Sequence, residues 1–362
     1  MGEKNVNQQK RRILISPLNW GLGHATRLIP LINILIKQGH YCLLAGEAPS
    51  ITILKDEFPQ LPVVQLQGFN IKLSKSNQQG LKLLTQAPSL FKAIKSEYLQ
   101  SQKLIEENHI NLIISDNRYG VHSDKVASII ITHQTQPYIG KAFRFFRPLS
   151  NQIIKKLIRK FDECWIPDMK APDNLTGNLS IPIQSLTTKH LGLLSRLATQ
   201  KIANTVSRTP DILVILSGPE PHRSKLEEIL IKKFINTDFK VTILKAKPGS
   251  KVENIKNIEL LPHCDVSTFK NLILKSKNII CRSGYSTIMD LFYCNKKAIL
   301  IPTPGQYEQE YLAHRMATLF GFKTISQKNL TQSPIDEFLQ PIIHHQELPF
   351  SSLLTTPLLP TK

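Results

Sequence analysis

Short runs of apolar residues alternate with segments of helical periodicity along most of this chain. The first run, residues 11–16 (RRILIS), is followed by a glycine turn and by apolar residues at helical spacing from Ile29 to Ile36, with Gly39 placed to end that helix. Further runs in the first half are YCLLAGE, INLIISD and ASIIITHQ (41–47, 110–116 and 127–134). Continuous apolar strands between helices are typical of a parallel sheet covered on both faces.

The same alternation starts again near residue 211. Its strand-like runs are DILVILSGPE, KVTILKA, NIELLP, KNIICRSG and KKAILIP, separated by amphipathic segments such as RSKLEEILIKKF. Between the two series, the chain is rich in Pro, Thr, Asn and Ser. We therefore predict an α/β protein with two Rossmann-like domains facing each other across a cleft. The predicted units are a first domain (1–165), a linker region with one or two strands (166–209), a second domain (210–340) and a tail (341–362).

The composition is that of an ordinary folded protein, with 41% hydrophobic and 20% charged residues among 362. Five widely spaced cysteines without a CxxC pair predict neither a disulfide framework nor a zinc site. The polar N-terminus lacks the apolar stretch of a secretory signal, and no run reaches the roughly 18 apolar residues of a membrane span. We expect a cytoplasmic protein.

The net charge of +19 is unusual and implies an anionic partner, which nucleic acid, acidic lipid or a phosphorylated small molecule would satisfy. Residues 141–160 (KAFRFFRPLSNQIIKKLIRK) hold seven Lys or Arg and no acid, with Leu149, Ile153, Leu157 and Phe161 on one helical stripe. This composition suits a helix on an anionic membrane surface, which would make the protein peripheral on the inner face of the cytoplasmic membrane. It also suits single-stranded nucleic acid, or an ordinary helix whose apolar face lies in the core. Because the chain has no recognised nucleic-acid motif, we expect no nucleic-acid partner.

The first glycine turn lies in SPLNWGLGHATR (16–27). Gly21 and Gly23 allow a ligand to approach the backbone closely, and the following helix start offers free N–H groups to an anion. His24 could hold a neutral imidazole ready to take a proton near neutral pH. The alternative is a tight turn with a surface histidine.

A second group of polar residues follows the strand-like run that ends in CRSGYSTIMD. Ser283 and Gly284 turn the chain, and Ser286 and Thr287 stand where they can cap a helix. The helix N–H groups and the Arg282 guanidinium together form an anion site suited to a diphosphate, and Asp290 lies one turn further on, within reach of a ribose diol. Taken singly, each residue also fits a capped structural helix. In the later loop TPGQYEQE, the prolines bar a helix, and the side chains of Gln306, Glu308, Gln309 and Glu310 match sugar hydroxyls.

Residues 281–321 resemble the C-terminal domain of the MurG-like, family 28 glycosyltransferases of the GT-B superfamily. NWGLGHATR and LSGPEPHR resemble the glycine loops of the same superfamily, so the resemblance spans most of residues 11–325. Asp290 is shorter than the Glu of the family, and the TPGQYEQE loop differs, which leaves the donor sugar undetermined. The resemblance implies a nucleotide-sugar site made of Gly21, Gly23, Ser217, Gly218, Leu261, Arg282, Ser283, Gly284, Ser286, Thr287, Asp290 and Gln309.

The resemblance further implies an inverting glycosyltransferase that moves a sugar from a nucleotide sugar, expected to be a UDP-sugar, to a hydroxyl of an acceptor glycan or lipid-linked glycan of the bacterial cell envelope. His24 would be the base, and Asp116, by analogy with inverting transferases of this fold, would hold its tautomer; a strand-end Asp that caps a turn is the alternative. His133 and Gln134 are candidate acceptor contacts. Because the chain has no DxD motif, we expect no metal and no cofactor besides the donor. A nucleotide-sugar hydrolase on the same fold and a nucleic-acid-binding protein remain the rival hypotheses.

Overall fold

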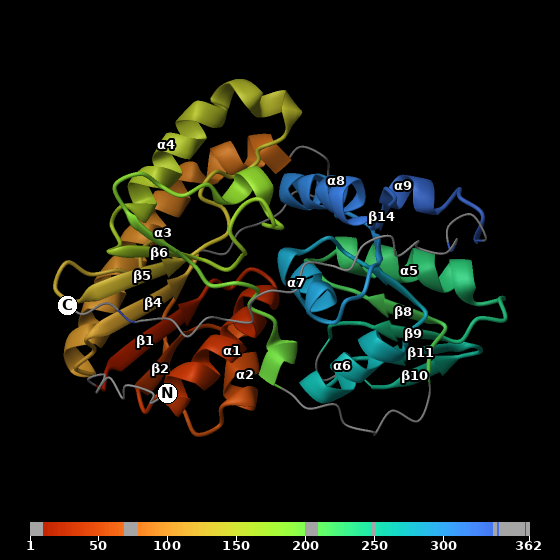
Figure 1. Cartoon of the computed structure of the whole chain (residues 1–362), viewed down its shortest axis with the longest axis horizontal. Coiled ribbons are helices and arrows are strands. Elements are labelled where there is room, and N and C mark those ends of the chain that lie inside the picture. The colour runs from red at the N-terminus through yellow and green to blue at the C-terminus, as the bar shows by residue number, and fades with distance from the viewer. Residues whose placement is uncertain are drawn as a thin grey trace, which may run out of the picture.

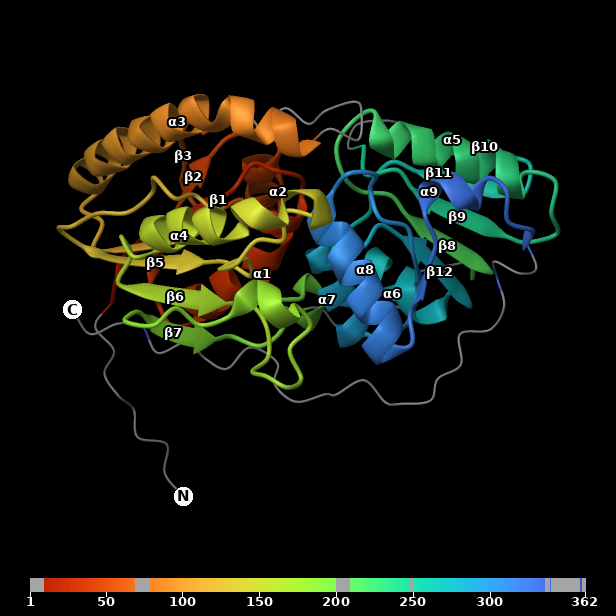
Figure 2. The ribbon, with the colours of Figure 1, turned by 90° about the horizontal axis from the view of Figure 1, so that it is seen from above.

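Two sheets of mainly parallel strands, each within its own domain, lie side by side in the computed structural model (Figures 1 and 2). The structure describes residues 10–68, 79–199, 209–247, 251–335, 339 and 359. The strand order is β3-β2-β1-β4-β5-β6-β7 in the first sheet and β10-β11-β9-β8-β12-β13-β14 in the second. The β10–β11 pair is antiparallel, whereas β1, β8 and β12 pair in parallel with each of their neighbours. This arrangement confirms the predicted fold class.

The elements follow the predicted alternation of strands and helices. Those of the first domain are β1 (Arg12–Pro17), α1 (Gly23–Lys37), β2 (Tyr41–Gly46), α2 (Ser50–Glu57), β3 (Val63–Gln65), α3 (Gln79–Glu107), β4 (Leu112–Asp116), β5 (Ala127–Ile131), η1 (Lys141–Phe146), α4 (Arg147–Ile158), β6 (Glu163–Ile166), η2 (Gly177–Ser180) and β7 (Thr187–His190). After η3 (Arg196–Thr199), those of the second are β8 (Ile212–Ile215), α5 (His222–Phe234), β9 (Val241–Leu244), β10 (Glu253–Ile255), β11 (Ile258–Leu261), α6 (Val266–Lys275), β12 (Asn278–Cys281), α7 (Tyr285–Tyr293), β13 (Ile299–Leu300), α8 (Tyr307–Phe320), β14 (Lys323–Thr324) and α9 (Gln327–Leu330).

Helices cover both faces of each sheet, and alternate strand residues point to opposite faces. In β1, Ile13 and Ile15 belong to the apolar cluster that contains α1, whereas Leu14 belongs to the cluster that includes residues of α3. In β8, Leu213 packs on the side of α6 and α7, and Val214 on the side of α5. Burial on both faces explains why these strands are continuous apolar runs in the sequence.

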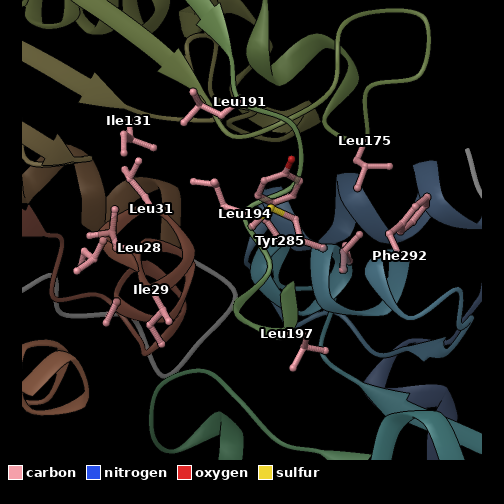
Figure 3. Close-up of a cluster of buried hydrophobic side chains, with 14 of the residues drawn as sticks. Leu28, Ile29, Leu31, Ile131, Leu175, Leu191, Leu194, Leu197, Tyr285 and Phe292 are labelled. Atoms are coloured by element: carbon pink, nitrogen blue, oxygen red, sulfur yellow. The ribbon is translucent and has the colours of Figure 1, made fainter. Parts of the chain in front are cut away.

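The two domains share one apolar cluster, which crosses from the first to the second. Figure 3 shows Leu194, in the segment that joins the domains, between Leu31 of α1 and Tyr285 of α7. Leu194 and Leu31 are 1% and 0% exposed, and Tyr285 is 3% exposed. The start of α7 is therefore packed onto α1, and the carboxyl ends of the two sheets are held against each other.

The predicted domain boundaries need a correction. β6 crosses residue 165, and β7, inside the predicted linker, pairs in parallel with β6 as the edge strand of the first sheet. The first domain therefore extends to His190, and its last strand was not recognised as part of the sheet because its residues, TTKH, are polar. Of the predicted tail, only Leu359 lies within the described residues, where it packs into the shared cluster.

In the part of the chain that the structure describes, no helix combines the length and the apolar character needed to cross a membrane. The five cysteines are all free thiols.

Candidate functional site

The strand order reverses between β1 and β4 in the first sheet, and ligands of open α/β sheets bind at such a point, outside the carboxyl ends of the strands. Pro17, the last residue of β1, lies opposite Asp116, the last residue of β4. The glycine turn follows β1, and Gly21 adopts a positive φ of 75° that favours glycine. α1 then begins at Gly23, so the topology places His24 and Asp116 at the same point of the sheet edge.

His24 and Asp116 make the predicted contact. Nδ1 of His24 lies 2.9 Å from Oδ1 of Asp116, and the two side chains are 13% and 0% exposed. Burial opposes ionisation of Asp116, but the Arg27 guanidinium and His24 outweigh it and lower the pKa of Asp116 to about 2. A carboxylate only accepts hydrogen bonds, so Nδ1 of His24 carries the proton and Nε2 keeps its lone pair.

Arg27, one turn after His24 on α1, is the second partner of Asp116 and was not predicted. Its Nε donates to Oδ2 of Asp116 at 2.6 Å, and its Nη2 donates to Oδ1. The side chain is 2% exposed, so this is a buried bidentate ion pair. Burial and the Arg27 charge lower the pKa of His24 below its ordinary value, which keeps the imidazole neutral at pH 7. The GHATR motif already contained this residue, with the spacing that places it on the face of His24.

The predicted pair His133 and Gln134 belongs to the same network. Nδ1 of His133 accepts a hydrogen bond from Nη1 of Arg27 at 3.0 Å. Nε2 of His133 lies 2.7 Å from Oε1 of Glu308, and Nε2 of Gln134 donates to Oε2 of Glu308 at 2.6 Å. Glu308 comes from α8 of the second domain, so the network crosses between the domains. His133 is 3% exposed and Gln134 is partly buried, and the two are occupied by protein partners.

The second sheet presents its own point of strand-order reversal, between β8 and β12. Ser217 and Gly218 follow β8, and Gly218 has a φ of 91°, which favours glycine. Ser283 and Gly284 follow β12 and lead into α7. The predicted nucleotide-sugar residues at these two strand ends therefore come to one edge of the second sheet, as parallel pairing of β8 with β12 requires.

The starts of α1 and α7 meet directly. Oγ of Ser286 donates to the carbonyl oxygen of Gly23 at 3.0 Å, and a Cβ on Gly23 would lie 2.6 Å from that same Oγ. A side chain at position 23 would therefore displace the Ser286 side chain from this contact. Thr287, the next residue of α7, is partly buried. The predicted helix-capping role needs a correction, because α7 has Gly284 at its N-cap and no side chain caps it.

Arg282 does not face the cleft, which corrects its predicted contact with a diphosphate. Its side chain is 0% exposed, and its guanidinium donates to the carbonyl oxygens of Ile301, Pro302 and His222 and to Oε1 of Gln327. These hydrogen bonds thus hold together the backbone segments that lie behind the strand ends. Burial lowers the pKa of Arg282 to about 10, so it stays charged at neutral pH.

Asp290 also differs from its predicted role at a ribose. Its Oδ1 accepts a hydrogen bond from Oγ of Ser195 at 2.6 Å, and its Oδ2 lies 3.4 Å from Nε of Arg196. The side chain is 6% exposed, and burial raises the pKa of Asp290 above the ordinary value. Asp290 therefore fastens α7 to the segment that joins the domains, because it points from the helix toward that segment.

Gln309, Ser283 and Leu261 complete the predicted set. Gln309 lies in the first turn of α8, which begins at Tyr307 inside the predicted loop, and its Oε1 accepts from the backbone N–H of Thr303 at 2.9 Å. Oγ of Ser283 donates to the backbone oxygen of Gln309. The Gln309 side chain thus stabilises the turn between β13 and α8, which corrects its predicted contact with the sugar. Leu261 ends β11 and is partly buried against the shared cluster.

Among the described residues, no group of three or more His, Cys, Asp or Glu side chains is arranged to hold a metal ion.

Comparison with known proteins supports the glycosyltransferase resemblance. Residues 236–352 match the Glycosyltransferase family 28 C-terminal domain. The UDP-N-acetylglucosamine--N-acetylmuramyl-(pentapeptide) pyrophosphoryl-undecaprenol N-acetylglucosamine transferase of Rickettsia typhi is 24% identical over 297 residues, which are 69% of this chain and 74% of that protein.

Solved glycosyltransferases share the two-domain fold. The spinosyn rhamnosyltransferase SpnG, complexed with thymidine diphosphate, has a TM-score of 0.61 at 12% identity, covering 89% of this chain and 90% of that one. MurG of Acinetobacter baumannii has a TM-score of 0.53 at 13% identity, covering 90% and 89%. The family 28 domain contains the strand end and helix start at residues 281–293, where the second domain contacts Gly23, the residue before His24. Residues 236–352 thus contain a glycosyltransferase family 28 C-terminal domain, and the chain has the two-domain GT-B fold and is similar to MurG-like glycosyltransferases.

Proposed function

We propose that this chain transfers a sugar, with inversion and without a metal ion, from a UDP-sugar to a hydroxyl group of a lipid-linked acceptor. The observation that carries the proposal is the position of His24. Its Nδ1 is held by the buried Asp116, and its backbone neighbour Gly23 touches the start of α7 in the second domain. A base in the first domain therefore lies next to the helix start that the family 28 domain supplies.

The base half of the reaction follows from the tautomer of His24. With the proton on Nδ1, the lone pair of Nε2 is free to take a proton from the acceptor hydroxyl while that oxygen attacks the anomeric carbon. The lowered pKa of His24 keeps the base unprotonated at neutral pH. When His24 becomes charged, the Asp116 carboxylate stabilises the imidazolium.

The nucleotide-sugar donor would bind at the edge of the second sheet. The N-terminal N–H groups of α7, which no side chain caps, would receive the diphosphate as it leaves with the electron pair of the glycosidic bond. The Ser286 hydroxyl would exchange its contact with Gly23 for a phosphate oxygen. Arg282 contributes indirectly, by holding the strand ends in place. The Rickettsia typhi relative is named for a UDP-N-acetylglucosamine donor and an undecaprenol acceptor, and SpnG was solved with a nucleoside diphosphate, which supports this choice of substrates.

A membrane location of the acceptor is supported by the basic segment at residues 141–160. Leu157 and Phe161 are buried, but the first half of the segment exposes apolar side chains: Phe145 79%, Phe146 54%, Leu149 56% and Ile153 38%. An ordinary core helix would bury all of its apolar stripe. Exposed aromatics beside Arg144 and Arg147 instead favour insertion at the headgroup level of an anionic bilayer, on the inner face of the cytoplasmic membrane.

The activity is tested by incubating the purified protein with UDP-N-acetylglucosamine, with and without a lipid-linked acceptor, in buffer containing EDTA. We expect slow release of free sugar alone, faster transfer with acceptor, no loss of rate with EDTA, and inversion at the anomeric carbon by NMR. Rapid sugar release unaffected by acceptor would identify a hydrolase. Dependence on added Mg²⁺ or retention of configuration would contradict the mechanism.

The membrane part is tested by cosedimentation with vesicles of phosphatidylglycerol and phosphatidylcholine. The double substitution Phe145→Ser/Phe146→Ser should weaken binding by at least about tenfold, since two large apolar side chains leave the bilayer. Leu319→Ser on α8 of the second domain, where the side chain is 50% exposed, is the matched control and should leave binding unchanged. Equal binding of wild type and the Phe double variant would exclude this surface.

A further inference from the structure

Glu308 belongs to the second domain, yet both of its carboxylate oxygens bind side chains of the first. Oε1 lies 2.7 Å from Nε2 of His133 and Oε2 lies 2.6 Å from Nε2 of Gln134. The side chain is 28% exposed. Burial raises the pKa of Glu308, but His133, His24 and Arg27 outweigh it and hold the pKa below its ordinary value, so Glu308 is a carboxylate at neutral pH.

The directions of the hydrogen bonds follow from what each group can donate. Arg27 has only donors, so Nδ1 of His133 must offer its lone pair to the guanidinium. The proton of a neutral His133 is then on Nε2, where it is donated to Glu308. His133 thus links Arg27 to Glu308 in a single tautomer, and its ring is fixed further by stacking on Tyr285, with ring centroids 4.4 Å apart.

The charges around His24 are those of one guanidinium and two carboxylates: Arg27, Asp116 and Glu308. With His24 and His133 neutral, Arg27, Asp116 and Glu308 together carry one net negative charge. Proton uptake by His24 would bring the net charge of the site to zero. Without the charge of Glu308, the same proton uptake would leave a net positive charge in a buried site, which is less favourable.

We propose that Glu308 is a positioning residue for His24, acting through His133 and Arg27, so that the second domain completes the environment of the base in the first. The hydrogen bonds to His133 and Gln134 require the two domains to be in contact. If the two domains separated, Glu308 would leave this network. His24 would then be a weaker base. The inference rests on the proposed function, in which His24 is the base, and assigns Glu308 to the base rather than to the sugar.

The direct test measures the pKa of His24 by NMR in protein with isotopically labelled histidine, the signal being assigned by its loss in His24→Gln. In Glu308→Gln, which keeps the shape of the side chain and removes its charge, the pKa of His24 should fall by about half a unit or more. Glu308→Asp keeps the charge and should leave this pKa close to that of the wild type. Glu310→Gln is the matched control, because Glu310 lies on the same helix but is exposed and contacts Gly305.

An unchanged pKa of His24 in Glu308→Gln, or an equal fall in Glu310→Gln, overturns the proposal. The kinetic counterpart is the acidic limb of kcat/KM, which should move to lower pH in Glu308→Gln by the same amount. A higher KM for the donor with an unmoved acidic limb would make Glu308 a sugar ligand and also overturn the proposal. The NMR titration needs no turnover, so its outcome stands apart from a failure of the wild type to transfer sugar.

Discussion

The buried ion pair between Arg27 and Asp116 leads to the sharpest prediction for this chain. Asp116→Asn removes one charge and leaves the Arg27 guanidinium, which is 2% exposed, without the carboxylate that binds it directly. The acceptors left to it are the amide oxygen introduced by the substitution and Nδ1 of His133, and the other carboxylate of the network, Glu308, is reached only through His133. Stranding one member of a buried pair costs about 3–5 kcal/mol of unfolding free energy, a large part of the 5–15 kcal/mol that a folded domain commonly has.

The double variant Arg27→Met/Asp116→Asn separates stability from catalysis. Removing both charges eliminates the stranded cation, so the unfolding free energy should return to within about 2 kcal/mol of the wild type. Transfer should stay low, because the amide cannot stabilise a charged His24 as the carboxylate does. Urea unfolding followed by circular dichroism, together with initial rates of transfer, measures both. A loss below about 1 kcal/mol in Asp116→Asn, or no recovery in the double variant, would refute this view of the pair.

Three further predictions follow from other contacts. Gly23→Ala places a Cβ 2.6 Å from Oγ and 3.2 Å from Cβ of Ser286, so the Ser286 side chain must shift at the start of α7, and initial-rate assays should show at least about a tenfold loss of transfer; a normal rate would mean that this contact is unimportant. The pKa of Asp116 is about 2 despite burial, because Arg27 and His24 lower it. The ionised carboxylate therefore contributes to the unfolding free energy above the ordinary Asp pKa of about 3.9, and this contribution is lost as the pH falls toward 2. Urea unfolding at pH 7, 4 and 3 should therefore show a steeper loss in the wild type than in Arg27→Met/Asp116→Asn, and parallel curves would contradict the assignment. Asp290→Asn should leave the Kd for UDP within about twofold by calorimetry, since the carboxylate faces Ser195 and Arg196; a tenfold loss would return Asp290 to the ribose.

The strands that the sequence predicted well are those buried on both faces. Runs such as ILI in β1 and IIC in β12 are apolar at every position because helices cover both sides of the sheet. β7 has no such run, since it lies at an edge and its residues are partly or fully exposed. Its place in the first sheet depends on pairing with β6, which periodicity does not reveal.

For the site, chain position was predictable and side-chain direction was not. His24 follows β1 and Asp116 ends β4, and these strands are neighbours in the sheet, so their meeting follows from the strand order. Arg282 and Asp290 lie beside an equivalent strand end, yet one points behind the strands and the other toward the joining segment. Those directions are set by contacts distant in the sequence, with Gln327 in one case and Ser195 in the other.

The central claim is that His24 removes the acceptor proton while the nucleotide is held by the other domain. Its most direct test is the transfer rate of His24→Ala, measured together with its Kd for UDP by calorimetry. We expect the rate to fall by about 10²–10⁴-fold with the Kd within about twofold of the wild type, because the imidazole acts on the acceptor and not on the nucleotide. A normal transfer rate in His24→Ala would contradict the account.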